Sequence, residues 1–70
     1  MTQNELKKIE GFLRRTFENP KLSVRARPRK TDSAEVYVGE DFLGVLSEDK
    51  EDGETSYHFQ MAILEIDLVD

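Results

Sequence analysis

Cysteine is absent from this chain of 70 residues, and histidine occurs only at position 58. Disulfides and thiolate zinc sites are therefore excluded, and a single imidazole without a thiol does not form a usual zinc centre. The lack of cysteine also fits a reducing compartment. Because a domain of this length buries only about 60% of the surface that its unfolded chain exposes, its stability has to come from close packing or from a partner subunit.

Long apolar runs are missing as well. No segment approaches the ~20 residues that cross a bilayer, and the charged N-terminal sequence MTQNELKKIEGF lacks the apolar core of a secretion signal. Apolar residues nevertheless make up 37% of the chain, in periodic patterns that indicate a folded protein. We expect a single domain, residues 1–70, that is cytoplasmic and has no cofactor, metal or membrane partner.

Positive charge is scarce in the second half of the chain. Residues 1–30 contain nine Lys and Arg against three acidic residues, a net charge of +6, whereas residues 31–70 contain Lys50 against twelve acidic residues, a net charge of −11. One domain must fold these halves together. The asymmetry therefore predicts intramolecular attraction between them before it predicts a binding site.

The N-terminal segment carries a helical pattern. Thr2 and Glu5 form a capping-box sequence. The apolar stripe that follows has helical spacing and consists of Leu6, Ile9, Leu13 and Phe17, with Phe12 beside it. Asn19-Pro20 ends the pattern, because Asn tolerates left-handed geometry and the residue before proline avoids the helical region. We predict a helix over residues 3–18.

Four segments with a period of two follow, over residues 22–27, 34–38, 41–46 and 55–68. The sequence RKTDS predicts a loop after the first. Gly39-Glu40 suits a type II′ turn, and Asp52-Gly53 a type I′ turn. The expected fold is α+β: one N-terminal helix packed on a four-stranded antiparallel meander, in the order α-β-β-β-β.

The arginines of the first strand have a structural interpretation. A hairpin that keeps both apolar sets on one face places either Arg25 or Arg27 directly opposite Glu35. Such a pair stabilises a sheet by a few tenths of a kcal/mol up to ~1. We therefore interpret the arginines as the solvent face of an edge strand, where charge also discourages unwanted strand pairing.

The last two strands have too many apolar residues for one buried face. With Asp52-Gly53 at the turn, Leu46 lies opposite Phe59, and one face is formed by Phe42, Leu46, Phe59, Met61 and Ile63. The other face is formed by Leu43, Val45, Ala62 and Leu64. One helix covers one face. A two-residue turn at Gly39-Glu40 puts the second set beneath it, a three-residue loop puts the first set there, and a bulge near Ile63 would mix them.

An exposed apolar face of that kind usually marks an interface. The alternative is that sheet twist, long basic side chains or a folded-back tail cover it. We predict a noncatalytic protein-interaction module that binds itself as a homodimer or binds another protein, through the uncovered face or through pairing of the last strand, which is an edge.

Two other functions have less support. Nucleic-acid binding would use a basic surface with Tyr37 as a stacking platform, although the net charge of the chain is −5. Its residues would be Arg14, Arg15, Lys21, Arg25, Arg27, Arg29 and Lys30. Catalysis lacks a nucleophile beside His58, and the acidic loop at 48–54 does not match a calcium-binding loop. We expect no enzyme activity.

Three stretches together carry a family resemblance: FLRRTFENP, ARPRKTDSAEVYVGEDFLGVL and DGETSYHFQMAILEIDL. They resemble a family of short alphaproteobacterial proteins known as the domain of unknown function number thirty-one twenty-six. The resemblance extends over nearly the whole chain. It implies a bacterial, cytoplasmic protein with one domain, and it implies no activity, ligand or catalytic residue.

Overall fold

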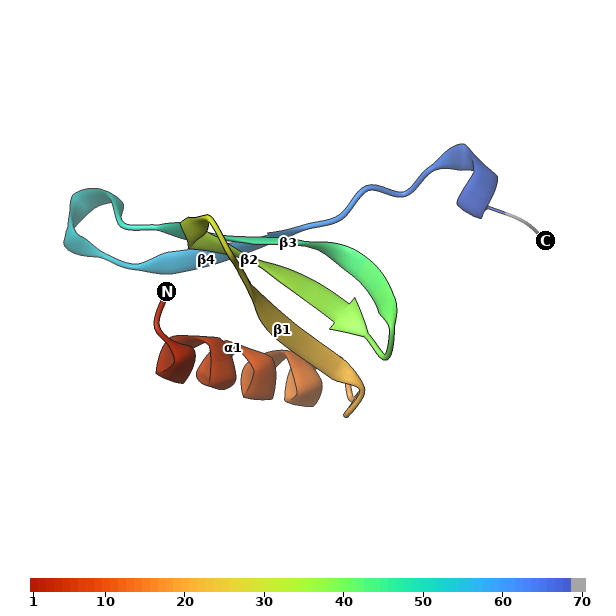
Figure 1. The fold of residues 1–70 in the computed structure, drawn as a ribbon, viewed down its shortest axis with the longest axis horizontal. Coiled ribbons are helices and arrows are strands. Elements are labelled where there is room, and N and C mark those ends of the chain that lie inside the picture. Colours follow the sequence, from red (N-terminus) through yellow and green to blue (C-terminus); the bar gives the residue numbers. More distant parts are fainter. Residues whose placement is uncertain (69–70) are drawn as a thin grey trace.

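The computed structural model describes residues 1–68, in which one helix is followed by a four-stranded antiparallel sheet (Figure 1). The helix is α1 (Gln3–Thr16), and the strands β1 (Leu22–Arg27), β2 (Lys30–Val38), β3 (Asp41–Asp49) and β4 (Ser56–Gln60) lie side by side in sequence order. Two 3-10 turns follow β3 and β4, namely η1 (Glu51–Gly53) and η2 (Glu65–Asp67). The predicted α+β meander is confirmed. Within residues 1–68, no helix has the length and apolar character needed to cross a membrane.

The ends of α1 follow the expected capping chemistry with one difference. Thr2 and Glu5 form the capping box. At the other end, the N–H of Asn19 donates to the carbonyl of Arg14 at 3.0 Å, and the N–H of Glu18 donates to that of Arg15 at 3.4 Å. These bonds form a Schellman motif, whose left-handed position is Glu18, with φ 53°. The helix therefore ends two residues earlier than predicted, and Asn19 is not the left-handed residue.

Polar side chains of α1 attach the helix to the outer edge of β1. The Glu10 carboxylate accepts a 3.0 Å hydrogen bond from the N–H of Val24, and Arg14 Nε donates to the carbonyl of Leu22 at 2.7 Å. Glu10 and Arg14 also pair with each other at 3.3 Å. An edge strand normally presents unpaired backbone groups, so these contacts both cover the edge and hold the helix at the β1 side of the sheet.

The buried core lies between α1 and one face of the sheet. It consists of Leu6, Leu13, Leu22, Val24, Ala34, Val36 and Leu46. Between β1 and β2, Arg25 lies opposite Glu35, which is one of the two predicted registers. The predicted loop RKTDS is wrong in extent, because β2 begins at Lys30 and only Pro28-Arg29 separate the strands, with an irregular register after Ala26.

A β-bulge at Leu43 decides which apolar residues lie beneath the helix. The Gly39-Glu40 turn has two residues, with φ 59° at Gly39 as a type II′ turn requires. Val38 pairs with Asp41 and Tyr37 with Phe42, but Val36 pairs with Gly44, so Leu43 is the extra residue. The bulge turns Gly44 and Leu46 toward the helix and leaves Phe42 on the opposite face.

The final strand is much shorter than predicted. Leu46 lies opposite Phe59 as expected, and the positive φ values of Asp52 and Gly53 fit a type I′ turn. However, β4 ends at Gln60 and does not continue to Leu68. A Cβ atom added at Gly44 would lie 2.3 Å from the Gln60 carbonyl oxygen, which shows how closely the two strands approach there. Beyond Gln60 the two strands separate: β3 bends at its bulge, and the chain that follows β4 runs away from β3 (Figure 1).

Candidate interaction surface

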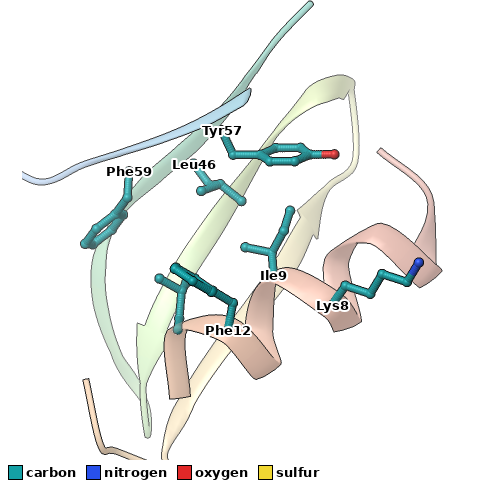
Figure 2. Close-up of a pocket in the computed structure, with 7 residues that line it drawn as sticks. Lys8, Ile9, Phe12, Leu46, Tyr57 and Phe59 are labelled. Atoms are coloured by element: carbon teal, nitrogen blue, oxygen red, sulfur yellow. The ribbon is translucent and has the colours of Figure 1, made fainter. Parts of the chain in front are cut away.

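A groove of about 420 Å³ lies between α1 and the β3–β4 hairpin. It exists because α1 is held at the β1 side, which leaves the β4 side of the same face only partly covered. Figure 2 shows Ile9 and Phe12 of α1 facing Leu46, Tyr57 and Phe59 of the strands, with Lys8 beside them. Leu46 is buried, Tyr57 and Phe59 are half-buried, and Phe12 is 56% exposed. The groove is therefore apolar and open to solvent.

A hydrogen bond closes the groove at the start of the helix. The Tyr57 hydroxyl donates to the Glu5 carboxylate at 2.9 Å, and the other carboxylate oxygen accepts the Thr2 N–H at 2.9 Å. Hydrogen bonds from the Thr2 backbone, Tyr57 and the Thr2 hydroxyl lower the pKa of Glu5 to about 2, and donation to Glu5 raises the pKa of Tyr57. The capping box thus connects α1 to β4 as well as starting the helix.

A second hollow of about 290 Å³ adjoins the groove. Leu13 and Phe59 line both, so the two are neighbouring parts of one apolar face. Phe17, Leu43 and Met61 lie at the second hollow. Of these, Phe17 is 56% exposed and Met61 is 44% exposed. The apolar face thus continues from α1 to the point where the chain leaves β4.

The segment after β4, Met61–Leu68, is here termed the C-terminal arm. Every residue of the arm is exposed. Its large apolar side chains are Met61, Ile63, Leu64, Ile66 and Leu68, of which Ile66 is 78% exposed and Leu68 is 71% exposed. The arm extends beyond the sheet and bends at η2 (Figure 1). The arm is therefore the most exposed apolar part of the described chain. Large apolar side chains are normally buried in a folded protein.

The structure divides the first predicted interface set between two faces and brings the second set together around one hollow. In the first set, Leu46 belongs to the core and Phe59 and Met61 line the helix side, whereas Phe42 lies on the opposite face beside Tyr37 and Ile63 is in the arm. In the second set, all four residues line a hollow of about 610 Å³ between β3 and the arm, and one of them, Leu43, also packs against the core.

The expected second apolar face of the β3–β4 hairpin is therefore confined to this hollow, beyond the end of β4. Opposite the helix, the paired part of the hairpin presents Ser47, His58 and Gln60 to solvent, with Val45 half-buried among them. The bulge at Leu43 and the end of β4 at Gln60 together explain the difference. The surplus apolar residues lie in the arm, along the groove and around the hollow between β3 and the arm.

The basic residues do not all lie on one free surface. Arg14 is engaged by Glu10 and Leu22, as described above, while Arg15 and Lys21 are exposed. The Arg25 guanidinium lies 4.0 Å from the centre of the Tyr37 ring, and the Tyr37 hydroxyl donates to Glu35 at 3.1 Å, which raises the pKa of Tyr37. One ring face of Tyr37 is thus already occupied. Arg27, Arg29 and Lys30 lie around the β1–β2 turn.

The expected attraction between the two charged halves does not take the form of direct ion pairs. Among the described residues, the pairs within 4.0 Å are Arg14–Glu10, Lys50–Glu48 and His58–Asp49, and each lies within one half of the chain. The basic charge of α1 and the acidic charge of the second half are both largely exposed. This leaves complementary charge on the surface.

The structure defines a small α+β domain with an apolar groove beside its helix and an exposed apolar arm. The chain belongs to the family described as "Protein of unknown function (DUF3126)", whose match covers residues 5–67 and so includes the groove and nearly all of the arm. No curated protein and no solved structure matches the chain.

Sequence reasoning missed two parts of this surface. It treated Phe12 as a flank of the helical stripe, although a large aromatic residue just off a buried stripe is suited to the rim of a groove. It also assigned residues 61–68 to a strand, because their alternation continues that of β4. The link between Glu5 and Tyr57 had no sequence signal, since 52 positions separate the two residues.

Proposed function

We propose that the protein is a small, noncatalytic protein-interaction module that acts in the cytoplasm and associates with itself as a homodimer. The observation that carries this proposal is the exposure of the C-terminal arm, where Ile63, Ile66 and Leu68 are each at least 65% exposed. Contiguous apolar surface of this kind is characteristic of interaction sites. Association would also add buried area to a domain whose own core, within residues 1–68, has seven buried residues.

The charge distribution supports self-association over binding of an unrelated acidic protein. Each copy exposes basic residues on α1, including Lys7, Lys8 and Arg15, and acidic residues in the arm, Glu65 and Asp67. Two copies can place these opposite charges against each other, whereas an acidic partner would meet only the basic half. Complementary potentials of this kind favour encounter and fix the orientation of partners.

The test is the mass of the protein in solution. Sedimentation velocity and light scattering from low to high micromolar concentration should show a concentration-dependent dimer. A monomer at every concentration contradicts self-association, and the interaction function would then need a different protein as partner.

Nucleic-acid accessory binding is the second candidate, favoured by one observation at the β1–β2 turn. Arg27 lies opposite Lys30, with Arg29 between them in the sequence. Like charges directly opposite each other destabilise a sheet, so an anion bound there would relieve repulsion. Labelled single-stranded RNA and DNA should bind at low salt and dissociate as salt rises. The absence of salt-sensitive binding would exclude this function.

A further inference from the structure

The proposed dimer requires a specific contact, and the structure contains two surfaces that suit each other. We propose that the C-terminal arm of one copy lies in the α1–β4 groove of a second copy, and that the exchange is reciprocal. This inference rests on the proposed self-association and adds the location of its interface.

The arm and the groove match in chemistry. The arm presents Ile63, Ile66 and Leu68 to solvent, and the groove presents Ile9, Phe12 and Phe59. An apolar cavity of about 150 Å³ holds one benzene-sized group. The groove volume of about 420 Å³ therefore suits two or three apolar side chains of the arm.

Charge gives the docking a second point of complementarity. In the arm, Glu65 and Asp67 alternate with Ile66 and Leu68. In the groove, Lys8 lies beside the apolar residues of α1 (Figure 2). Lys8 has no ion-pair partner within 4.0 Å among residues 1–68, so it is available to a carboxylate of the second copy.

The geometry favours a second copy over the same chain. The arm leaves β4 at the end remote from the start of α1 and continues away from the sheet (Figure 1). The four residues before η2, Met61–Leu64, span about 13 Å when extended. The arm thus projects far enough from the sheet to enter the groove of a second copy. Because each copy has one arm and one groove, reciprocal exchange satisfies both and closes the assembly at two subunits.

The absence of cysteine allows a direct test of this contact. A Phe12→Cys chain and an isotopically labelled Ile66→Cys chain are mixed and oxidised, and disulfide-linked peptides are quantified by mass spectrometry. The control pairs Ile66→Cys with Phe42→Cys, because Phe42 is 53% exposed and Phe12 is 56% exposed, but on opposite faces. We expect at least about tenfold more linkage to position 12 than to position 42, since only position 12 lies at the proposed interface.

Equal linkage, or preferred linkage to position 42, would refute arm docking in the groove while leaving self-association intact. Linkage that forms only when both cysteines are in one chain would show that the arm folds back on its own groove, which also refutes the exchange. A monomeric wild-type protein would refute the proposed self-association itself, and with it the exchange.

Affinity measurements provide an independent test in the full-length protein. Phe12→Ser and Ile66→Ser should each raise the dimer Kd about tenfold or more, and Phe42→Ser should leave it within a factor of two. Lys8→Glu should raise the Kd more than Lys7→Glu, a matched change on the same helix at a residue outside the groove. Circular dichroism verifies that each variant is folded. If Phe42→Ser weakens the dimer and Phe12→Ser does not, the interface lies on the other sheet face and the inference is wrong.

Discussion

The Tyr57 hydroxyl donates a 2.9 Å hydrogen bond to the Glu5 carboxylate and so joins the first turn of α1 to β4. Glu5 simultaneously completes the capping box with Thr2. One carboxylate therefore has two structural roles, one local and one between distant parts of the chain. Its pKa of about 2, against an ordinary value of 4.5, reflects the hydrogen bonds that its charged form accepts.

The first prediction concerns the pH dependence of stability. Because the pKa of Glu5 is lower in the folded protein than in the unfolded chain, the Glu5 contribution is fully present above about pH 4.5 and is lost as the pH falls toward 2. Glu5→Gln should lower the Tm at pH 7 and flatten the decline in Tm between pH 4.5 and 2, measured by circular dichroism. Tyr57→Phe should flatten the decline partly. Parallel pH profiles for wild type and Glu5→Gln would contradict this account.

The second prediction concerns the close approach at Gly44. Gly44→Ala should destabilise the protein by about 1–3 kcal/mol or more, because the new Cβ would lie 2.3 Å from a backbone oxygen and 2.9 Å from Met61 Cβ. Gly11→Ala is the control. Its Cβ meets only the flexible end of Arg15 at 3.3 Å, so the better helix propensity of alanine should raise stability by up to ~1 kcal/mol. Urea unfolding measures both, and equal effects would refute the explanation.

A third prediction tests the polar attachment of α1 to β1. Glu10→Ala should lower the free energy of unfolding by about 1–2 kcal/mol, because it leaves the Val24 N–H without its acceptor and removes the Arg14 partner. Glu10→Gln retains an acceptor oxygen and should cost less. Hydrogen exchange at the Val24 amide should accelerate in the alanine variant. Unchanged exchange would show that this bond does not protect the strand edge.

The fourth prediction uses the left-handed residue at the end of α1. Glu18 has φ 53°, a conformation that costs a residue with a side chain about 1–2 kcal/mol relative to glycine. Glu18→Gly should therefore stabilise the protein by roughly 1 kcal/mol in urea unfolding. Thr16→Gly, within the helix, should destabilise it by a similar amount or less. A destabilising Glu18→Gly change would contradict the Schellman geometry.

Much of the fold follows from local sequence chemistry. The capping box and the 3.6-residue stripe determine α1, and the period of two together with Gly39-Glu40 and Asp52-Gly53 determines the meander. Because the apolar residues of β1 and β2 must share one face of the sheet, the first hairpin is limited to two registers, one of which places Arg25 opposite Glu35. These features depend on residues that are close in sequence or joined by a short turn, so their patterns are readable without a structure.

The candidate site depended on features that sequence periodicity does not contain. The alternation of residues 55–68 continues without a break, yet the strand ends at Gln60 because the bulge at Leu43 bends its partner away. A single extra residue reversed the facing of Phe42 relative to Leu46, and the expected second apolar face was confined to the hollow between β3 and the arm. The position of α1 at the β1 edge was set by Glu10 and Arg14, and it opened the groove.

The sequence by itself thus determined the elements, their order and the surplus of apolar side chains, because these depend on local spacing and composition. Only the tertiary structure decided where the surplus lies. The reason is physical: the direction of a strand beyond a bulge and the placement of a helix on a sheet result from contacts between residues distant in the chain.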